Sequence, residues 1–122
     1  MTTLTAFYDL AVGPVSFDFV VFAVQAEIER RRIGARRLHF CIVPDPNGPG
    51  GFRDKSHFYD EHEARWRLNN IVLPATQLFG ASYTFAADWL QAKRLASDKD
   101  WKQWPADWDR QTLKARHHLV GG

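Results

Sequence analysis

The chain has 122 residues, a length that suits one domain with a buried core, and 45% of its residues are hydrophobic. Its formal net charge of +2 is too small to indicate a protein that binds nucleic acid. A single cysteine excludes a disulfide scaffold. The sequence shows neither a basic signal-peptide region nor an apolar run long enough for a bilayer, so we predict a cytoplasmic protein without a transmembrane segment.

The first part of the chain predicts a βαβ unit. Residues 4–10 are almost continuously apolar, as expected of a strand buried in a parallel sheet. Gly13 and Pro14 interrupt this pattern, a long apolar helix follows, and residues 38–43 form a second apolar run that Pro44 ends. Because a strand–helix–strand connection is almost always right-handed, the two strands are predicted to be parallel.

The helix between these strands is predicted to begin at Ser16, whose hydroxyl can cap the first turn, and to end at Gly34. One helical face consists of Phe17, Val20, Val21, Val24 and Ile28. Other faces are apolar too, at Phe19, Phe22, Ala23 and Ala26. A helix that is apolar nearly all round is predicted to pack under a second helix or to form part of an interface.

A loop rich in glycine and proline follows the second strand at residues 44–53. The next helix is predicted from Asp60, which forms a capping-box pattern with Glu63. Pro74 lies inside this helix, where it removes a backbone donor, so we expect a kink or a short break there.

Residues 82–86 predict a third strand, and Asp88 with Gln91 predicts the start of a helix that extends to about residue 96. Together these elements predict an α/β, Rossmann-like three-layer domain at residues 1–96, with a small parallel sheet of about three to four strands flanked by helices.

Residues 97–122 are predicted to be a Trp-rich covering segment, either irregular or with a short helix from Pro105. The chain closes with Leu-Val-Gly-Gly, which is typical of a strand and turn that lead further. This pattern leaves open that the domain is an incomplete part of a larger architecture.

The turns after the first three strands predict a ligand-binding rim, because open α/β sheets bind ligands beyond the carboxyl ends of their strands. The residues of this predicted rim are Asp9, Gly13, Ser16, Asp18, Asp45, Asn47, Gly48, Gly50, Gly51, Arg53 and Asp88. Such a set suits hydrogen bonding to a sugar or a phosphate. It contains no matched acid–base pair, so it predicts binding without assigning a catalytic residue.

Other chemistry has little support in the sequence. The five histidines lack the spacing of a zinc site; they are His39, His57, His62, His117 and His118. Cys41 lies in an apolar strand without an activating base. The five arginines at positions 30, 31, 32, 36 and 37 are interpreted as a solvated helix end rather than a phosphate or membrane site. We therefore predict no metal and no cofactor.

Three stretches, at residues 7–19, 31–46 and 63–74, carry a resemblance of pattern. There the chain resembles the amino-terminal Rossmann-like half of GT-B-type glycosyltransferase-like bacterial proteins associated with surface-polysaccharide synthesis. The resemblance implies an acceptor-side domain whose donor-binding half lies elsewhere, so the chain alone is not expected to be catalytic. It implies a missing second domain, with a homo-oligomer as the other possibility.

Two alternatives to this glycosyltransferase-like function follow from the residues. The apolar helix and the tryptophans also suit a non-catalytic α/β module that docks on a protein partner. The predicted rim also suits a small α/β enzyme that binds a phosphorylated metabolite.

Overall fold

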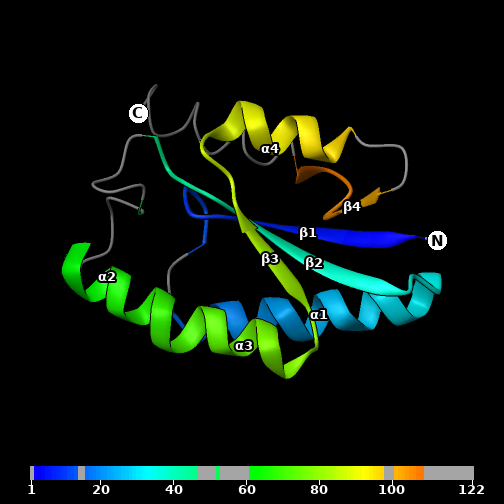
Figure 1. Cartoon of the computed structure of the whole chain (residues 1–122), viewed down its shortest axis with the longest axis horizontal. Coiled ribbons are helices and arrows are strands. Elements are labelled where there is room, and N and C mark those ends of the chain that lie inside the picture. Colours follow the sequence, from blue (N-terminus) through cyan, green and yellow to red (C-terminus); the bar gives the residue numbers. More distant parts are fainter. Residues whose placement is uncertain (1, 14–15, 47–51, 53–60, 98–100, 109–122) are drawn as a thin grey trace.

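The computed structural model describes residues 2–13, 16–46, 52, 61–97 and 101–108. The elements in chain order are β1 (Thr3–Asp9), α1 (Asp18–Ile33), β2 (Arg37–Val43), α2 (Glu61–Arg67), the π-helical turn η2 (Leu68–Val72), α3 (Leu73–Leu78), β3 (Ser82–Phe85), α4 (Trp89–Ala96) and β4 (Trp101–Trp104). The four strands form one parallel sheet in the order β3-β2-β1-β4 (Figure 1). The predicted α/β, Rossmann-like class with a small parallel sheet is confirmed.

The chain winds across the sheet in two directions. From β1 it moves through β2 to β3, with α1 and the α2–η2–α3 segment on one face of the sheet (Figure 1). From β3 it returns over the opposite face through α4 and adds β4 on the free side of β1. The winding direction therefore reverses between β1 and β4, which is the topological switch point of the sheet.

Each face of the sheet has its own buried cluster, because successive side chains of a strand point to opposite faces. The cluster on the α1 face contains aromatic and aliphatic side chains of β1, β2 and the covering helices, among them Leu4, Tyr8, Phe19, Phe40, Ile42 and Val72. The cluster on the α4 face is smaller and consists of Phe7, Cys41, Val43, Ala86, Ala92 and Trp108. The main core therefore lies between the sheet and α1.

Helix α1 buries one of its apolar faces against the sheet and leaves another exposed. Phe19, Ala23 and Ala26 are its buried residues, and the two alanines let the helix lie close to the sheet. Most residues of the other apolar face are exposed: Phe17 is 70% exposed, Val21 58%, Val24 42% and Ile28 61%. The sequence predicted a helix that is apolar nearly all round and did not assign its buried face, because hydrophobic spacing cannot choose between two apolar faces of one helix.

The predicted irregularity before Pro74 is confirmed and takes the form of the π-helical turn η2. There the amide of Leu73 donates to the carbonyl of Leu68, five residues earlier. Pro74 follows this turn as the second residue of α3. The helical segment thus accommodates Pro74 through one wider, π-helical turn. The predicted capping residue Asp60 lies outside the described residues.

Strand β4 differs from the prediction of an irregular segment or short helix after residue 96. Trp101–Trp104 is a strand that pairs in parallel with β1, from Thr3 opposite Trp101 to Ala6 opposite Trp104. The indole of Trp104 packs against the Phe22 ring, with ring centroids 4.9 Å apart. Pairing with a distant strand overrode the weak local pattern. Residues 101–104 are therefore part of the sheet and not only a cover over it.

Candidate functional site

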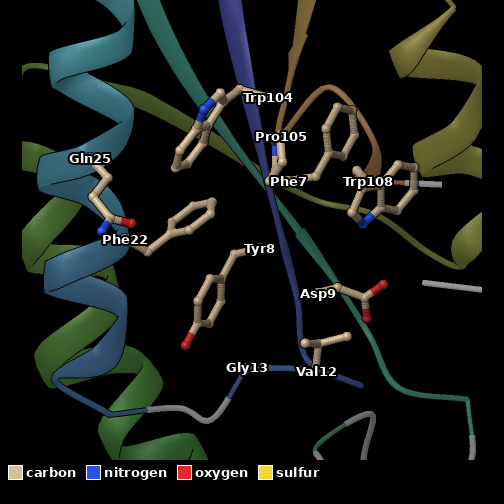
Figure 2. A pocket seen from close by; sticks show the side chains of 10 residues that line it. All are labelled: Phe7, Tyr8, Asp9, Val12, Gly13, Phe22, Gln25, Trp104, Pro105 and Trp108. Atoms are coloured by element: carbon tan, nitrogen blue, oxygen red, sulfur yellow. The ribbon is translucent and has the colours of Figure 1, made fainter. Parts of the chain in front are cut away.

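A crevice of about 250 Å³ opens where the carboxyl ends of β1 and β4 diverge (Figure 2). Strand β1 continues beyond Ala6 to Asp9, whereas the chain turns away from β1 after Trp104. The described residues that line the crevice are Phe7, Tyr8, Asp9, Val12, Gly13, Phe22, Gln25, Trp104, Pro105 and Trp108. The crevice lies at the topological switch point, which is where open α/β sheets bind their ligands.

The wall on the α1 side is aromatic. The Phe22 ring lies 5.0 Å from the Tyr8 ring and 4.9 Å from the Trp104 indole, measured between centroids. Tyr8 also makes an edge contact with Phe19 at 4.9 Å, which anchors this wall in the main core. The wall is therefore continuous with the main core.

The opposite wall is a stacked pair on the α4 side. The rings of Phe7 and Trp108 lie 4.5 Å apart and nearly parallel, at 16°. Trp108 is 1% exposed, and no hydrogen-bond partner is present for its indole N–H among the described residues. Figure 2 shows this ring beside Phe7, with its nitrogen on the side of Asp9. A buried indole N–H without an acceptor is uncommon, because Trp normally finds a partner for it when buried.

The floor of the crevice is the turn after β1. The Oδ1 atom of Asp9 accepts a hydrogen bond from the Ala11 amide at 2.9 Å, and the Asp9 carbonyl accepts from the amides of Val12 and Gly13. A Cβ atom at Gly13 would lie 2.7 Å from the Tyr8 ring, so only glycine fits this close approach. The buried carboxylate of Asp9 is thereby fixed beside both aromatic walls.

The structure brings two residues of the predicted rim, Asp9 and Gly13, into the crevice. Ser16 and Asp18 lie together at the start of α1, where the Ser16 hydroxyl accepts from the Asp18 amide at 3.2 Å. This bond is the kind predicted for Ser16, although the helix itself begins at Asp18. Asp45 is buried just after β2.

Asp88, another member of the predicted rim, caps α4. Its Oδ1 atom accepts from the Gln91 amide at 2.8 Å, while the Gln91 side chain accepts from the Ala87 amide at 2.6 Å. The predicted cap is confirmed. The remaining predicted rim residues, Asn47, Gly48, Gly50, Gly51 and Arg53, lie outside the described residues.

A second hollow of about 410 Å³ lies at the carboxyl ends of β2 and β3. Its described lining combines apolar side chains with one guanidinium and one amide, and consists of Leu10, Ile42, Pro44, Phe52, Arg65, Leu68, Asn69, Phe85, Ala86 and Ala87. Arg65 lies over the Phe52 ring, with 5.8 Å from its guanidinium carbon to the ring centroid. This hollow is close to the predicted rim, but it lies away from the switch point.

The reactive groups outside the crevice have structural roles. Burial, with a smaller contribution from Asp9, raises the pKa of the Cys41 thiol to about 12, so the thiol stays protonated at neutral pH. His39 lies between Ser82 and Thr84, with its ring nitrogens 2.6 and 2.7 Å from their hydroxyls. The described residues contain no cluster of His, Cys, Asp or Glu that could hold a metal ion.

The arginines at the end of α1 are engaged with the helix. Arg30 makes a bidentate contact with Glu27 and donates to the Ala35 carbonyl, Arg31 also contacts Glu27, and Arg32 pairs with Glu29. Gly34 ends the helix in the left-handed conformation at φ 72°. These contacts agree with the interpretation of a solvated helix end.

Sequence reasoning missed most of the crevice, namely Phe7, Tyr8, Val12, Phe22, Gln25, Trp104, Pro105 and Trp108. The available signal was the concentration of tryptophans around Pro105, which was interpreted as a cover. The pairing of β4 with β1 is what brings Trp104 and Trp108 to the crevice, and the sequence alone does not show that pairing.

Comparison with protein-family models, with curated proteins and with solved structures found no match. Among the residues that the structure describes, no helix is both long enough and apolar enough to cross a membrane.

Proposed function

We propose that this chain binds a carbohydrate in the crevice between β1 and β4, as the acceptor-side domain of a glycosyltransferase-like protein in bacterial surface-polysaccharide synthesis. The observation that carries the proposal is that Trp108 lines the crevice and that its buried indole N–H has no acceptor among the described residues. A ligand oxygen in the crevice would supply that acceptor.

The aromatic walls support a sugar ring as the ligand. Trp104 and Phe22 form one wall, and Phe7 and Trp108 form the other. The faces of a pyranose ring are made of C–H groups and pack on aromatic rings, whose faces carry partial negative charge. The volume of about 250 Å³ lies below the usual range of about 300–1,000 Å³ for small-ligand pockets, which suits one sugar unit rather than a long chain.

The polar groups of the crevice support a ligand that both donates and accepts hydrogen bonds. The Asp9 carboxylate accepts, the Trp108 indole donates, and the Gln25 amide can do either. Sugar hydroxyls match this combination, since each can donate to one group and accept from another. In this function the chain holds and orients an acceptor, and a separate donor-binding domain would supply the activated sugar.

The same lining argues against the phosphorylated-metabolite alternative at this crevice. Its described residues include the carboxylate of Asp9 and neither lysine nor arginine. A phosphate group would be repelled by that carboxylate and would find no guanidinium or ammonium partner there. A neutral glycan meets no such penalty.

Nuclear magnetic resonance of the five tryptophan indole groups tests the proposal. The protein is titrated with neutral hexoses, N-acetylhexosamines and short glucans, and in a parallel series with hexose phosphates. We expect the Trp104 and Trp108 indole signals to shift with a neutral sugar, while the signal of Trp66, exposed on α2, stays in place. Shifts with hexose phosphates alone would favour the phosphometabolite enzyme, and no shift with any sugar would overturn the proposal.

A matched pair of variants tests whether the indole N–H of Trp108 contributes to sugar binding. Trp108→Phe keeps a ring stacked on Phe7 but removes the indole N–H, and we expect sugar affinity to fall about tenfold, as for the loss of one hydrogen bond. Trp66→Phe is the control and should leave the affinity unchanged. Equal sugar affinities of the wild type and Trp108→Phe would show that the indole N–H does not contribute to binding.

A further inference from the structure

The second hollow, at the carboxyl ends of β2 and β3, is separate from the crevice, because the described linings of the two share no residue. Both open at the carboxyl edge of the parallel sheet, the edge at which open α/β sheets bind ligands. The hollow measures about 410 Å³, which falls within the usual range of about 300–1,000 Å³ for small-ligand pockets. It is therefore large enough for a molecule built on one ring.

Most of the lining of this hollow is apolar. Leu10, Ile42 and Phe52 are buried side chains of the main core. The Phe85 ring is 45% exposed and makes an edge contact with the Tyr83 ring, with centroids 5.5 Å apart. Aromatic and aliphatic walls of this kind can pack against the apolar face of a ring.

The polar side chains of the hollow come from one helical segment. Arg65 of α2 and Asn69 of η2 are four residues apart and line the hollow together. The guanidinium carbon of Arg65 lies 5.8 Å from the centroid of the Phe52 ring. A guanidinium has five N–H donors in its plane, so it can bind an anion while it keeps an aromatic contact. Among the described lining residues, Arg65 carries the only charge.

From these observations we infer that the second hollow binds a carboxylate carried on a ring. The carboxylate lies at Arg65 and Asn69, and the ring packs against Phe52 and Phe85. A guanidinium matches the single negative charge of a carboxylate, and two of its N–H groups fit the two oxygens. The Asn69 amide can donate to the same group.

The charge of the hollow disfavours a phosphate monoester as the ligand. Such a group carries about −1.5 to −2 charges at neutral pH, and the described lining offers one cation. Two classes of compound share the inferred chemistry, namely sugar acids, whose ring faces consist of C–H groups, and aromatic acids. Both present an apolar ring and one carboxylate.

Nuclear magnetic resonance of the full chain tests the inference, with the Arg65 Nε–H and the Asn69 side-chain amide as reporters. The probes are glucuronate and benzoate, each compared with its own neutral amide, and inorganic phosphate. Ligands of this size bind weakly, so we expect a Kd on the order of 1–10 mM for the acid that fits. The acid should shift both reporters and its amide should not. The Trp104 and Trp108 indole signals monitor the crevice separately.

A matched pair of variants assigns the charge. Arg65→Gln should weaken binding of the acid about tenfold or more, measured at Asn69, because it removes a charged hydrogen-bond donor. Arg94→Gln makes the same change on α4, on the opposite face of the sheet, and should leave the affinity unchanged. Circular dichroism checks that each variant remains folded.

The pattern of shifts identifies the ligand class. Shifts with glucuronate alone would assign the hollow to a sugar acid, and shifts with benzoate alone to an aromatic acid; either result supports the inference, as do shifts with both. No shift with either acid, or shifts with phosphate alone, would overturn it. Equal shifts with an acid and its amide would overturn it too, because the carboxylate would then not be recognised.

Discussion

The two faces of the sheet bury different kinds of side chain, although the same strands supply both. Towards α1, β1 and β2 present Leu4, Ala6, Tyr8, Leu38, Phe40 and Ile42. Towards α4, they present Thr5, Phe7, Asp9, His39, Cys41 and Val43. The first face is apolar and is covered by the 16 residues of α1, whereas the second contains three buried polar residues beside the 8 residues of α4. The α1 face stabilises the fold, and the α4 face holds most of the groups that can bind or titrate.

The largest expected change in unfolding free energy comes from replacing buried phenylalanines on the two faces of the sheet. Phe40→Ala should lower the free energy of unfolding by about 3–5 kcal/mol, because Phe40 is packed among the rings of Phe19 and Phe22. Phe7→Ala should lower it by at least about 1 kcal/mol less, because Phe7 borders the crevice and its space can open to solvent. Urea denaturation measures both. Equal losses would mean that the two faces contribute alike.

The cap of α4 gives the next largest effect. Asp88→Ala removes the acceptor of the Gln91 amide and should cost about 1 kcal/mol of unfolding free energy. Asp18→Ala, at the start of α1, is the control and should cost no more than about 0.5 kcal/mol, because no hydrogen bond from its side chain caps the helix. Thermal denaturation monitored by circular dichroism compares them, and a larger loss for Asp18→Ala would contradict the prediction.

His39 should make the α4 face sensitive to acid. Burial lowers the pKa of His39 below its ordinary value of 6.5, so the unfolded chain takes up the proton at a higher pH than the folded protein. The unfolding free energy should therefore decrease as pH falls below about 6.5 towards the lower pKa of the folded state. The neighbouring Ser82, Thr84 and Trp101 stay uncharged in this range.

His39→Gln provides the comparison, because its amide can still bond to the two hydroxyls. Urea midpoints at pH 7.5 and 5.5 should differ less for this variant than for the wild type. An identical pH dependence in both proteins would show that His39 does not titrate with folding.

Cys41 provides the smallest effect on stability and a clear effect on reactivity. With its pKa at about 12, the folded thiol should react with an aromatic disulfide reagent at pH 8 at least about 100-fold more slowly than the chain unfolded in urea. The folded pKa exceeds the ordinary value of 9.0, so this residue should also lower the unfolding free energy as pH rises from about 9 towards 12. Equal rates in the folded and unfolded protein would place the thiol at the surface.

Much of the fold could be predicted from local patterns. The apolar runs of β1 and β2, the glycine after α1, the cap at Asp88 and the break before Pro74 all depend on neighbouring residues, and the structure has each of them. The buried face of α1 could not be predicted, because both of its faces are apolar and only the sheet decides between Phe19 and Phe17.

The candidate site was predictable only in part. Asp9 and Gly13 follow directly from a strand that could be recognised, so the sequence indicated them. Trp104 and Trp108 belong to a strand and turn whose position depends on pairing with β1. Lys102 and Gln103 in that strand give no strong strand pattern, and a distant pairing partner leaves no local signal.

The pairing of β1 with β4 joins the two ends of the described chain. Thr3 leaves the ribosome long before its partner Trp101, which emerges only after α1, α2, α3 and α4 have been synthesised. Until then, one side of β1 presents open backbone amides and carbonyls to other chains. Newly made protein should therefore be most exposed to strand-mediated aggregation during translation, and slow synthesis of the last third would prolong that period.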